Sequence, residues 1–225
     1  MFTKRLNPIK KFSIGRNMSL SADTTWDPSQ NLPKFIKEEL NSNSKPSLNA
    51  FFHMVSQLKV PRTGWVHLGI PEPEHIGDHM YRMSIICLTL PLINLDKEKC
   101  IKIALVHDLA EALVGDIVPS DPMGKVEKSK REYKAMLYLA SFMGDEGEKI
   151  VELWKDYELQ RCKEGILVKD IDKYELLLQT WEYENKHNKK LDEFWNCRNI
   201  VKNDIVKDLV SELWEKREKF WSQQI

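Results

Sequence analysis

An apolar segment near the middle of the chain contains three side chains that could do chemistry, namely His107, Asp108 and Glu111. The residues around them are apolar on nearly every side, which predicts a buried helix. Burial of these groups without partners is costly, so we expect something to neutralise them. A divalent metal ion suits this role, because imidazole and carboxylate are good ligands and the cation favours the ionised carboxylate. His107 and Glu111 are four residues apart and are expected on one helix face, with Asp108 offset by about 100°.

One helix cannot complete a coordination sphere, and two other segments supply candidate ligands. His79 lies near the start of a second predicted helix, and Asp172 is an acid inside another apolar helical stretch. Taken alone, a histidine beside an apolar face is usually a core residue, and a helical aspartate usually faces water. Together, the imidazoles of His79 and His107 and the carboxylates of Asp108 and Asp172 favour a metal site.

The elements that must position these residues are predicted to be helices almost throughout. Apolar residues recur at helical spacing and the alternating pattern of β-strands is essentially absent, so we expect an all-α bundle. Pro46 and Ser47 precede the first clear helix, and Asp96 is a good N-cap for the third. Residues 60–77 contain several glycines and prolines and are expected to form an ordered but non-helical connection. The predicted helices span residues 48–58, 78–91, 97–109, 123–143, 146–162, 165–188 and 203–222.

Length and composition fit one large domain, placed at residues 26–225, after a short N-terminal segment. The chain has 225 residues, of which 42% are hydrophobic, so it can build a core and is not a disordered chain. Equal numbers of basic and acidic side chains, 34 of each, argue against a dedicated nucleic-acid binder. The four cysteines are scattered and suit neither a zinc knuckle nor a disulfide framework. No stretch is long and apolar enough for a membrane helix, so a soluble intracellular protein is expected.

The N-terminal segment, residues 1–25, differs from the rest of the chain. Its first 22 residues contain five basic and no acidic side chains. Such a composition is typical of a mitochondrial transit peptide and equally of a disordered basic tail. The predicted location is therefore cytoplasmic, with mitochondrial targeting by residues 1–22 as the alternative.

Four ordered blocks of this sequence resemble the HD-domain 5′-deoxynucleotidases, and the eukaryotic branch with its fungal members is the nearest match. The order of His79, then His107 with Asp108, then Asp172 is similar to the signature of the HD-domain metal-dependent phosphohydrolases. The resemblance covers most of residues 26–220. The four blocks are Arg62–Trp65, Gly77–Met83, Ala104–Ile117 and Val168–Tyr174.

The resemblance implies an all-α HD-domain helical bundle that hydrolyses deoxyribonucleoside 5′-monophosphates to deoxynucleoside and phosphate. Glu111 matches the family's acid near the attacking water, and Asp116 matches an acid at the pocket edge that is linked to substrate. In the eukaryotic branch, the same two acids also hold a second metal. The family's ligands for the first metal match His79, His107, Asp108 and Asp172.

Three further residues are implied in substrate binding. Trp65 matches the aromatic side chain that closes on the sugar and helps to reject a 2′-hydroxyl. Bacterial members place an arginine directly before this tryptophan, where Gly64 stands here, and Arg62 takes the place used in the eukaryotic branch. Arg62 or Arg82 could neutralise the dianionic phosphate through a bidentate contact, although Arg82 is equally suited to a structural salt bridge. Lys173 is another cation beside the motif, and a surface position suits it better.

The resemblance also implies a divalent metal cation, a small-molecule substrate and a homodimer, with no nucleic-acid or membrane partner. Manganese, cobalt or magnesium is favoured, and iron or zinc also suits these ligands. The C-terminal helices, with Trp195, Trp214 and Trp221, could supply the dimer surface, although core packing explains tryptophans equally well. Two other functions stay open: another HD-domain nucleotide phosphohydrolase, acting on a triphosphate or cyclic nucleotide, and a non-catalytic helical binding protein with a structural metal.

Overall fold

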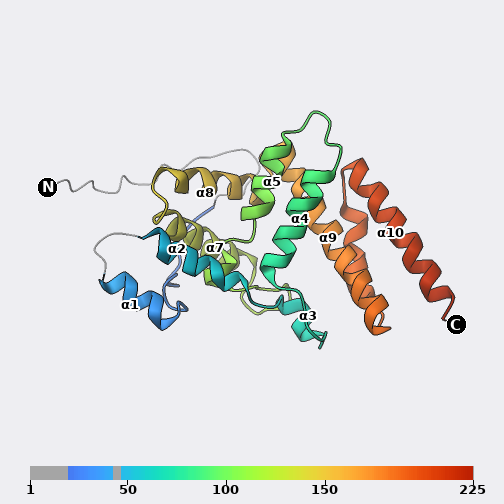
Figure 1. Cartoon of the computed structure of the whole chain (residues 1–225), viewed down its shortest axis with the longest axis horizontal. Helices are drawn as coiled ribbons and strands as arrows, with labels where there is room; N and C mark the ends of the chain where they lie inside the picture. Colours follow the sequence, from blue (N-terminus) through green and yellow to red (C-terminus); the bar gives the residue numbers. More distant parts are fainter. Residues whose placement is uncertain (1–19, 43–46, 225) are drawn as a thin grey trace.

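The computed structural model describes residues 20–42 and 47–224 (Figure 1). These residues form ten α-helices and two 3₁₀ helices and contain no β-strand, which confirms the predicted all-α class. The helices are α1 (Lys34–Ser42), α2 (Leu48–Val55), η1 (Ser56–Leu58), α3 (Thr63–His67), α4 (Ile76–Thr89), α5 (Lys97–Val106), α6 (Glu111–Val114), α7 (Lys125–Ala140), α8 (Asp145–Glu158), α9 (Lys163–His187), η2 (Asp192–Ile200) and α10 (Asp204–Ser222).

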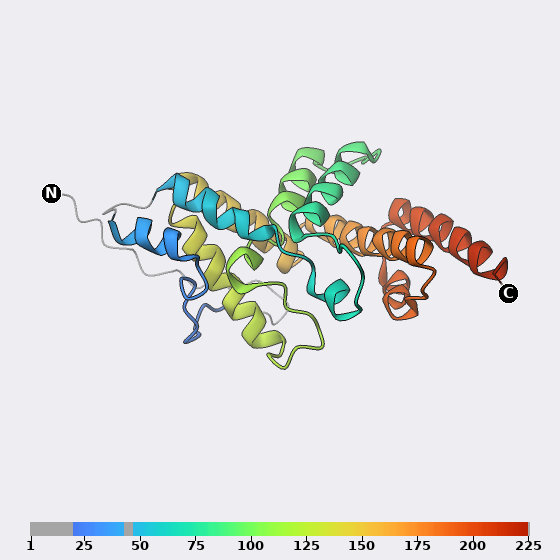
Figure 2. The same cartoon turned by 60° about the horizontal axis from the view of Figure 1, so that its bottom comes forward.

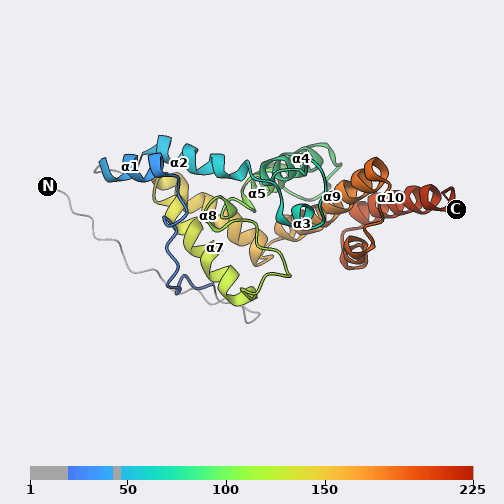
Figure 3. The same ribbon diagram turned by 90° about the horizontal axis from the view of Figure 1, so that it is seen from below.

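The molecule is elongated, with the long helix α9 in its middle (Figures 2 and 3). Helix α9 contacts α4, α5, α8, α10 and η2, so it joins the two ends of the molecule. Helices α1, α2, α7 and α8 lie at one end, and α10 lies at the other (Figure 1).

Two large hydrophobic clusters and a smaller one form the core, and the candidate residues lie where the two large clusters meet. Met80 and Leu109 belong to the cluster built around α2, α7 and α8. Met83 and Ile103 belong to the cluster built around α4, α5, α9 and α10. His79 precedes Met80, and the polar segment that starts at His107 lies between Ile103 and the end of α6. This placement explains how polar side chains come to be buried between apolar layers.

Local capping explains several helix starts. The Ser47 side chain accepts a hydrogen bond from Asn49 N at the start of α2, and Asp96 accepts one from Lys99 N at the start of α5. Both confirm predicted start signals; Pro46 lies outside the described residues, as do the first 19 residues of the predicted N-terminal segment. Helix α4 begins at Ile76 rather than near Asp78, because Asp78 is its third residue and its carboxylate accepts from His75 N at 2.9 Å.

Two expectations about helices are wrong, and both concern the candidate site. The connection over residues 60–77 contains the short helix α3, which the buried Trp65 anchors to the core. The predicted third helix does not run through to Leu109: α5 ends at Val106, a turn follows, and α6 begins at Glu111. The backbone N–H of Glu111 donates to the carbonyl of Asp108 at 3.0 Å, a bond to the third preceding residue. Side chains three residues apart eclipse in such tight turns, so Asp108 and Glu111 share one side.

None of the helices in the described ranges is long and apolar enough to cross a membrane.

Candidate metal centre

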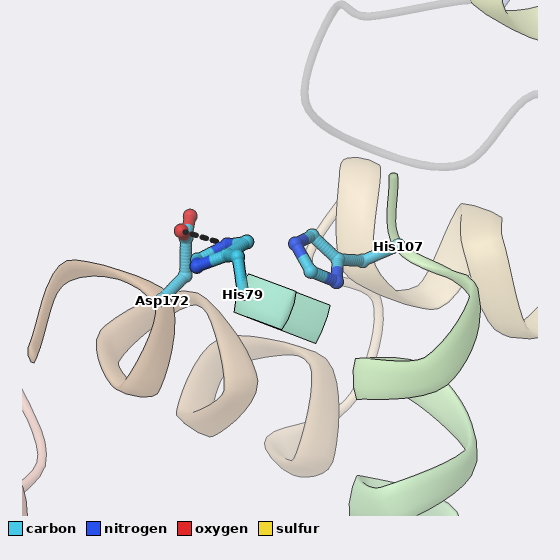
Figure 4. A group of neighbouring side chains, drawn as sticks. All are labelled: His79, His107 and Asp172. Carbon is cyan, nitrogen blue, oxygen red and sulfur yellow. Dashed lines mark ion pairs between the residues drawn. The ribbon is translucent and has the colours of Figure 1, made fainter. Parts of the chain in front are cut away.

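His79 and His107 face each other from α4 and from the end of α5, with ring centroids 5.3 Å apart (Figure 4). Each ring is oriented through its Nδ1 atom: His107 Nδ1 lies 2.9 Å from the carbonyl of Ala104, and His79 Nδ1 contacts a carboxylate oxygen of Glu175. Both Nε2 atoms are buried and have no hydrogen-bond partner among the described residues. A polar atom left this way is costly, unless it binds something that the protein itself does not supply.

Two carboxylates lie within ion-pair distance of these imidazole nitrogens, although neither is in hydrogen-bond geometry with them. Asp108 Oδ2 lies 3.0 Å from His107 Nε2 and 3.9 Å from His79 Nε2. Asp172 Oδ1, from α9, lies 3.4 Å from His79 Nε2. One ligand atom each of His79, His107 and Asp172 lie within 4.8 Å of one another. Two imidazole nitrogens and two carboxylate oxygens fit a divalent transition metal or magnesium. The structure thus brings all four predicted ligands together.

Tyr157 of α8 completes the surroundings of Asp172, and sequence reasoning missed it. Its hydroxyl donates to Asp172 Oδ2 at 2.6 Å, and its ring lies 4.8 Å from that of His107. Burial raises the pKa of Asp172, but its contact with His79 and the charge of Lys169 outweigh burial and hold that pKa well below its usual value. Asp172 is therefore ionised and can use its second oxygen for a metal.

Glu175 and Arg82 form a paired network behind His79. Arg82 Nε donates to Glu175 Oε1 at 2.7 Å, while its Nη1 and Nη2 bind Glu182 and Gln179 at 2.9 and 2.6 Å. Burial raises the pKa of Glu175, but His79 and Arg82 lower it further than burial raises it. An ionised carboxylate on Nδ1 fixes the ring and leaves Nε2 for a metal. These contacts favour the structural role that the sequence left open for Arg82.

Glu175 was not predicted from the sequence, although the sequence contains a signal for it. It is one more acid within the apolar stretch of α9 that contains Asp172, and its side chain is fully buried. An acid three residues from a candidate ligand on the same helix could have been predicted to support that ligand or its neighbour.

Glu111 is buried beside Asp108, as the tight turn between α5 and α6 requires. Burial and the charges of Asp108 and Asp116 raise the pKa of Glu111 well above its usual value, against Lys128 and Arg62, which lower it. A cation among these carboxylates would favour the ionised form of Glu111. Lys128, from α7, was not singled out in the sequence because it lies in a run of charged residues.

Arg62 lies directly before α3, and the charges of Asp108, Glu175 and Asp172 act on it. Its Nε is 3.9 Å from Glu74 Oε1, and its Nη1 is buried with no hydrogen-bond partner in the described part of the chain. Burial lowers the pKa of Arg62, but the charges of Glu74 and Asp108 raise it above its usual value, so the guanidinium is charged. A buried charged donor without a partner can receive an anion.

Asp116 and Trp65 are placed differently from the ligands. Asp116 Oδ2 accepts from the backbone N–H of Thr63 at 2.6 Å, which ties it to the start of α3. Trp65 is 1% exposed, and its indole lies between the rings of Tyr183 and Phe194 at centroid distances of 5.1 and 4.6 Å. A sugar would reach this indole only if the region opened.

Four other positions considered in the sequence lie outside the cluster. Lys173 Nζ donates to Asp170 at 3.0 Å, which keeps it away from the metal ligands. Of the three C-terminal tryptophans, Trp195 is 1% exposed and belongs to the core, whereas Trp214 and Trp221 are half-buried.

Comparison with known proteins now defines the class. The model of the HD domain family matches residues 55–214, so the chain belongs to the HD domain family and carries its fold. This confirms the family that the sequence blocks indicated.

Individual relatives give a narrower comparison than the family model does. The 5′-deoxynucleotidase YGK1 of Saccharomyces cerevisiae is 44% identical over 213 residues, which cover 90% of this chain and 98% of that protein. The 5′-deoxynucleotidase HDDC2 of Danio rerio is 48% identical over 149 residues, covering 64% of this chain and 74% of the relative. The solved structure named HD domain-containing protein YGK1 matches with a TM-score of 0.68 and 36% identity, covering 87% of this chain and 99% of that one.

Proposed function

We propose that this chain is a metal-dependent 5′-deoxynucleotidase, which hydrolyses deoxyribonucleoside 5′-monophosphates to deoxynucleoside and phosphate. One observation carries the metal dependence: two buried Nε2 atoms, of His79 and His107, lack hydrogen-bond partners among the described residues and face two carboxylates. The reaction itself is supported by relatives that carry this activity in their names and match nearly the whole chain.

His79, His107, Asp108 and Asp172 would hold the ion. Manganese, cobalt and magnesium are the favoured ions, and iron or zinc also suits the donor set. A bound divalent cation supplies a water of lowered pKa and polarises a phosphoryl oxygen.

The chain's own residues then bind and orient the reactants. Arg62 Nη1 donates to a phosphate oxygen. This role is supported by its being a buried, charged donor without a hydrogen-bond partner among the described residues. Glu111 orients the water or accepts its proton. This role is supported by the backbone hydrogen bond from Glu111 N–H to the Asp108 carbonyl, a tight turn in which side chains three residues apart share one side. Asp116 keeps one carboxylate oxygen for the sugar or for a second metal, since Thr63 occupies the other. Trp65 helps to exclude a 2′-hydroxyl after a local movement.

Phosphate release from matched deoxynucleoside and ribonucleoside 5′-monophosphates tests this function. The protein is treated with a chelator and then given Mn²⁺, Co²⁺ or Mg²⁺. We expect release that disappears on chelation, returns with metal and prefers the deoxy series. Equal rates for both sugars would contradict the deoxy selectivity. Release only from triphosphates or cyclic nucleotides would assign a different phosphohydrolase activity, and binding of metal without any release would indicate a non-catalytic protein.

We also propose a homodimer. Tyr81, Ile85 and Leu88 are exposed and lie three and four residues apart on α4, so they form an apolar stripe that a second copy could cover. Light scattering after size exclusion tests this, and a monomer mass at micromolar concentration would contradict it.

A further inference from the structure

Residues 115–118 form a short strap between α6 and the segment that leads to α7, and this strap is held from both sides. It begins at Gly115, whose φ of 84° lies in the region that only glycine adopts readily. It carries Asp116, the acid assigned above to substrate. No regular element includes the strap, so its position depends on side chains that reach it.

From one side, α3 holds the strap at Asp116, its second residue. The backbone N–H of Thr63 donates to Asp116 Oδ2 at 2.6 Å, and the Thr63 hydroxyl donates to the Asp116 carbonyl at 2.8 Å. A Cβ added at Gly64 would lie 4.0 Å from Val118 Cγ1, so the start of α3 and the strap are in close approach. Arg62 directly precedes Thr63, and the strap and the phosphate-binding arginine are therefore linked.

From the other side, α7 holds the strap through one lysine. Lys128 Nζ donates to the carbonyl of Ile117 at 2.9 Å and lies 3.5 Å from Glu132 Oε1, one turn further along α7. The Lys128 side chain is 32% exposed, so most of its stem is inside the protein. Removal of this ammonium would leave the Ile117 carbonyl without its partner and Glu132 without its counter-charge.

We propose that Lys128 is a positioning residue for substrate binding. It fixes the strap at Ile117, the strap fixes Asp116 against Thr63, and Thr63 fixes the start of α3 beside Arg62. The inference rests on the proposed function, because it takes Asp116 and Arg62 as substrate-binding groups. Lys128 acts through them and makes no hydrogen bond to any of the four metal ligands. Its charge also acts on Asp108 and Glu111, so loss of that charge should weaken substrate binding without weakening metal binding.

Steady-state kinetics with a deoxynucleoside monophosphate, and Mn²⁺ titration without substrate, separate these effects. We compare Lys128→Met, Lys128→Arg and Lys125→Met, since Lys125 is an exposed lysine on the same helix. Lys128→Met should raise KM about tenfold and change kcat and Mn²⁺ affinity less than about threefold. Lys128→Arg keeps the charge and the donors and should restore KM to within about threefold, and Lys125→Met should match the wild type.

Three results would overturn the proposal. The first is a KM for Lys128→Met equal to that of Lys125→Met. The second is a fall in Mn²⁺ affinity as large as the rise in KM, and the third is a KM for Lys128→Arg as high as that of Lys128→Met. If Lys128→Met does not fold, Thr63→Val provides the second variant, because it removes the hydroxyl donor to the strap and keeps the shape. It should raise KM in the same direction, and an unchanged KM would contradict the linkage.

Hydrogen exchange keeps this inference separate from the proposed function. If the wild type hydrolyses no monophosphate, the proposed function fails. Exchange of the strap amides in the Mn²⁺-loaded protein still tests whether Lys128 holds the strap in place. Amide exchange over residues 115–118 should be faster in Lys128→Met than in Lys125→Met. Equal exchange rates would show that Lys128 does not hold the strap in place.

Discussion

The two sides of the histidine cluster differ in how fully their polar groups are paired. Behind His79, in what we call the rear network, Arg82 donates to Glu175, Gln179 and Glu182, and Glu175 contacts His79 Nδ1. The groups that we call the front groups are Arg62, Glu111 and the two Nε2 atoms. Arg62 Nη1 and both Nε2 atoms lack hydrogen-bond partners among the described residues. Paired groups hold a neighbour in place, whereas unpaired buried groups are available to a ligand.

The carboxylates of the two sides also differ in charge. In the rear network the pKa of Glu175 is lowered despite burial, because His79 and Arg82 face it. Among the front groups, burial raises the pKa of Glu111. Burial also raises the pKa of Glu132, which lies beside Lys128 on α7, to about 7. An added cation would therefore stabilise the front and would gain little at the rear.

Loss of a ligand from the cluster should have the largest effect. Asp108→Ala removes the carboxylate that lies near both Nε2 atoms, so we expect phosphate release to fall by about a thousandfold or more. Phosphate release and Mn²⁺ binding measure this, with circular dichroism as the check on folding. Activity surviving in a folded Asp108→Ala would contradict the metal assignment.

Loss of the front arginine should affect substrate and leave metal alone. Arg62→Met is expected to raise KM for a deoxynucleoside monophosphate about 10–100-fold, because a charged hydrogen bond to phosphate is lost. Mn²⁺ affinity, measured without substrate, should change little. Arg82→Met serves as the comparison, and a larger KM effect from Arg82 than from Arg62 would reverse the distinction between the two sides.

Loss of the rear carboxylate should affect metal first. Glu175→Gln weakens the contact that orients His79, so Mn²⁺ affinity should fall about tenfold. Glu182→Gln is the matched control, since Glu182 binds the same arginine but does not reach the histidine. Calorimetric titration of the apoprotein measures both, and equal affinities would show that the rear network does not orient a ligand.

The smallest expected effect concerns the pH dependence of stability and Glu132, which lies beside Lys128. Burial raises the pKa of Glu132 from 4.5 to about 7, against the charge of Lys128. The folded protein therefore binds a proton that the unfolded chain releases, and stability falls as the pH rises between these values. The Glu132→Gln variant has no ionisable group at this position. Between pH 5 and pH 8, its free energy of unfolding should therefore fall by about 1–3 kcal/mol less than that of the wild type. Urea unfolding measures this, and parallel pH profiles would contradict it.

Part of the site could be predicted from local sequence. His107 and Asp108 stand out because they interrupt an apolar segment, and Ser47 and Asp96 cap helices as their residue types predict. The tight turn after Val106 could not be predicted, because apolar periodicity is nearly the same for one helix and for two short helices joined by a turn. That turn places Glu111 beside Asp108.

Other roles depend on contacts between residues far apart in the chain. Arg62 and Arg82 are the same residue type near the same motif, and no local pattern separates them. Only the packing of α4 against α9 pairs Arg82 with Glu175, and only the position of α3 leaves Arg62 Nη1 free. Trp65 is likewise buried because it packs against Tyr183 and Phe194, which lie more than a hundred residues away in the sequence.

Apolar periodicity and the order of motifs are local properties, so the class of the fold, the family and the four candidate ligand positions could be read from the sequence alone. The tertiary structure decided which side chains are paired and which are free, since hydrogen bonding and desolvation depend on neighbours from distant segments. For this protein, that pairing distinguishes the residues that hold the centre in place from those that can meet a substrate.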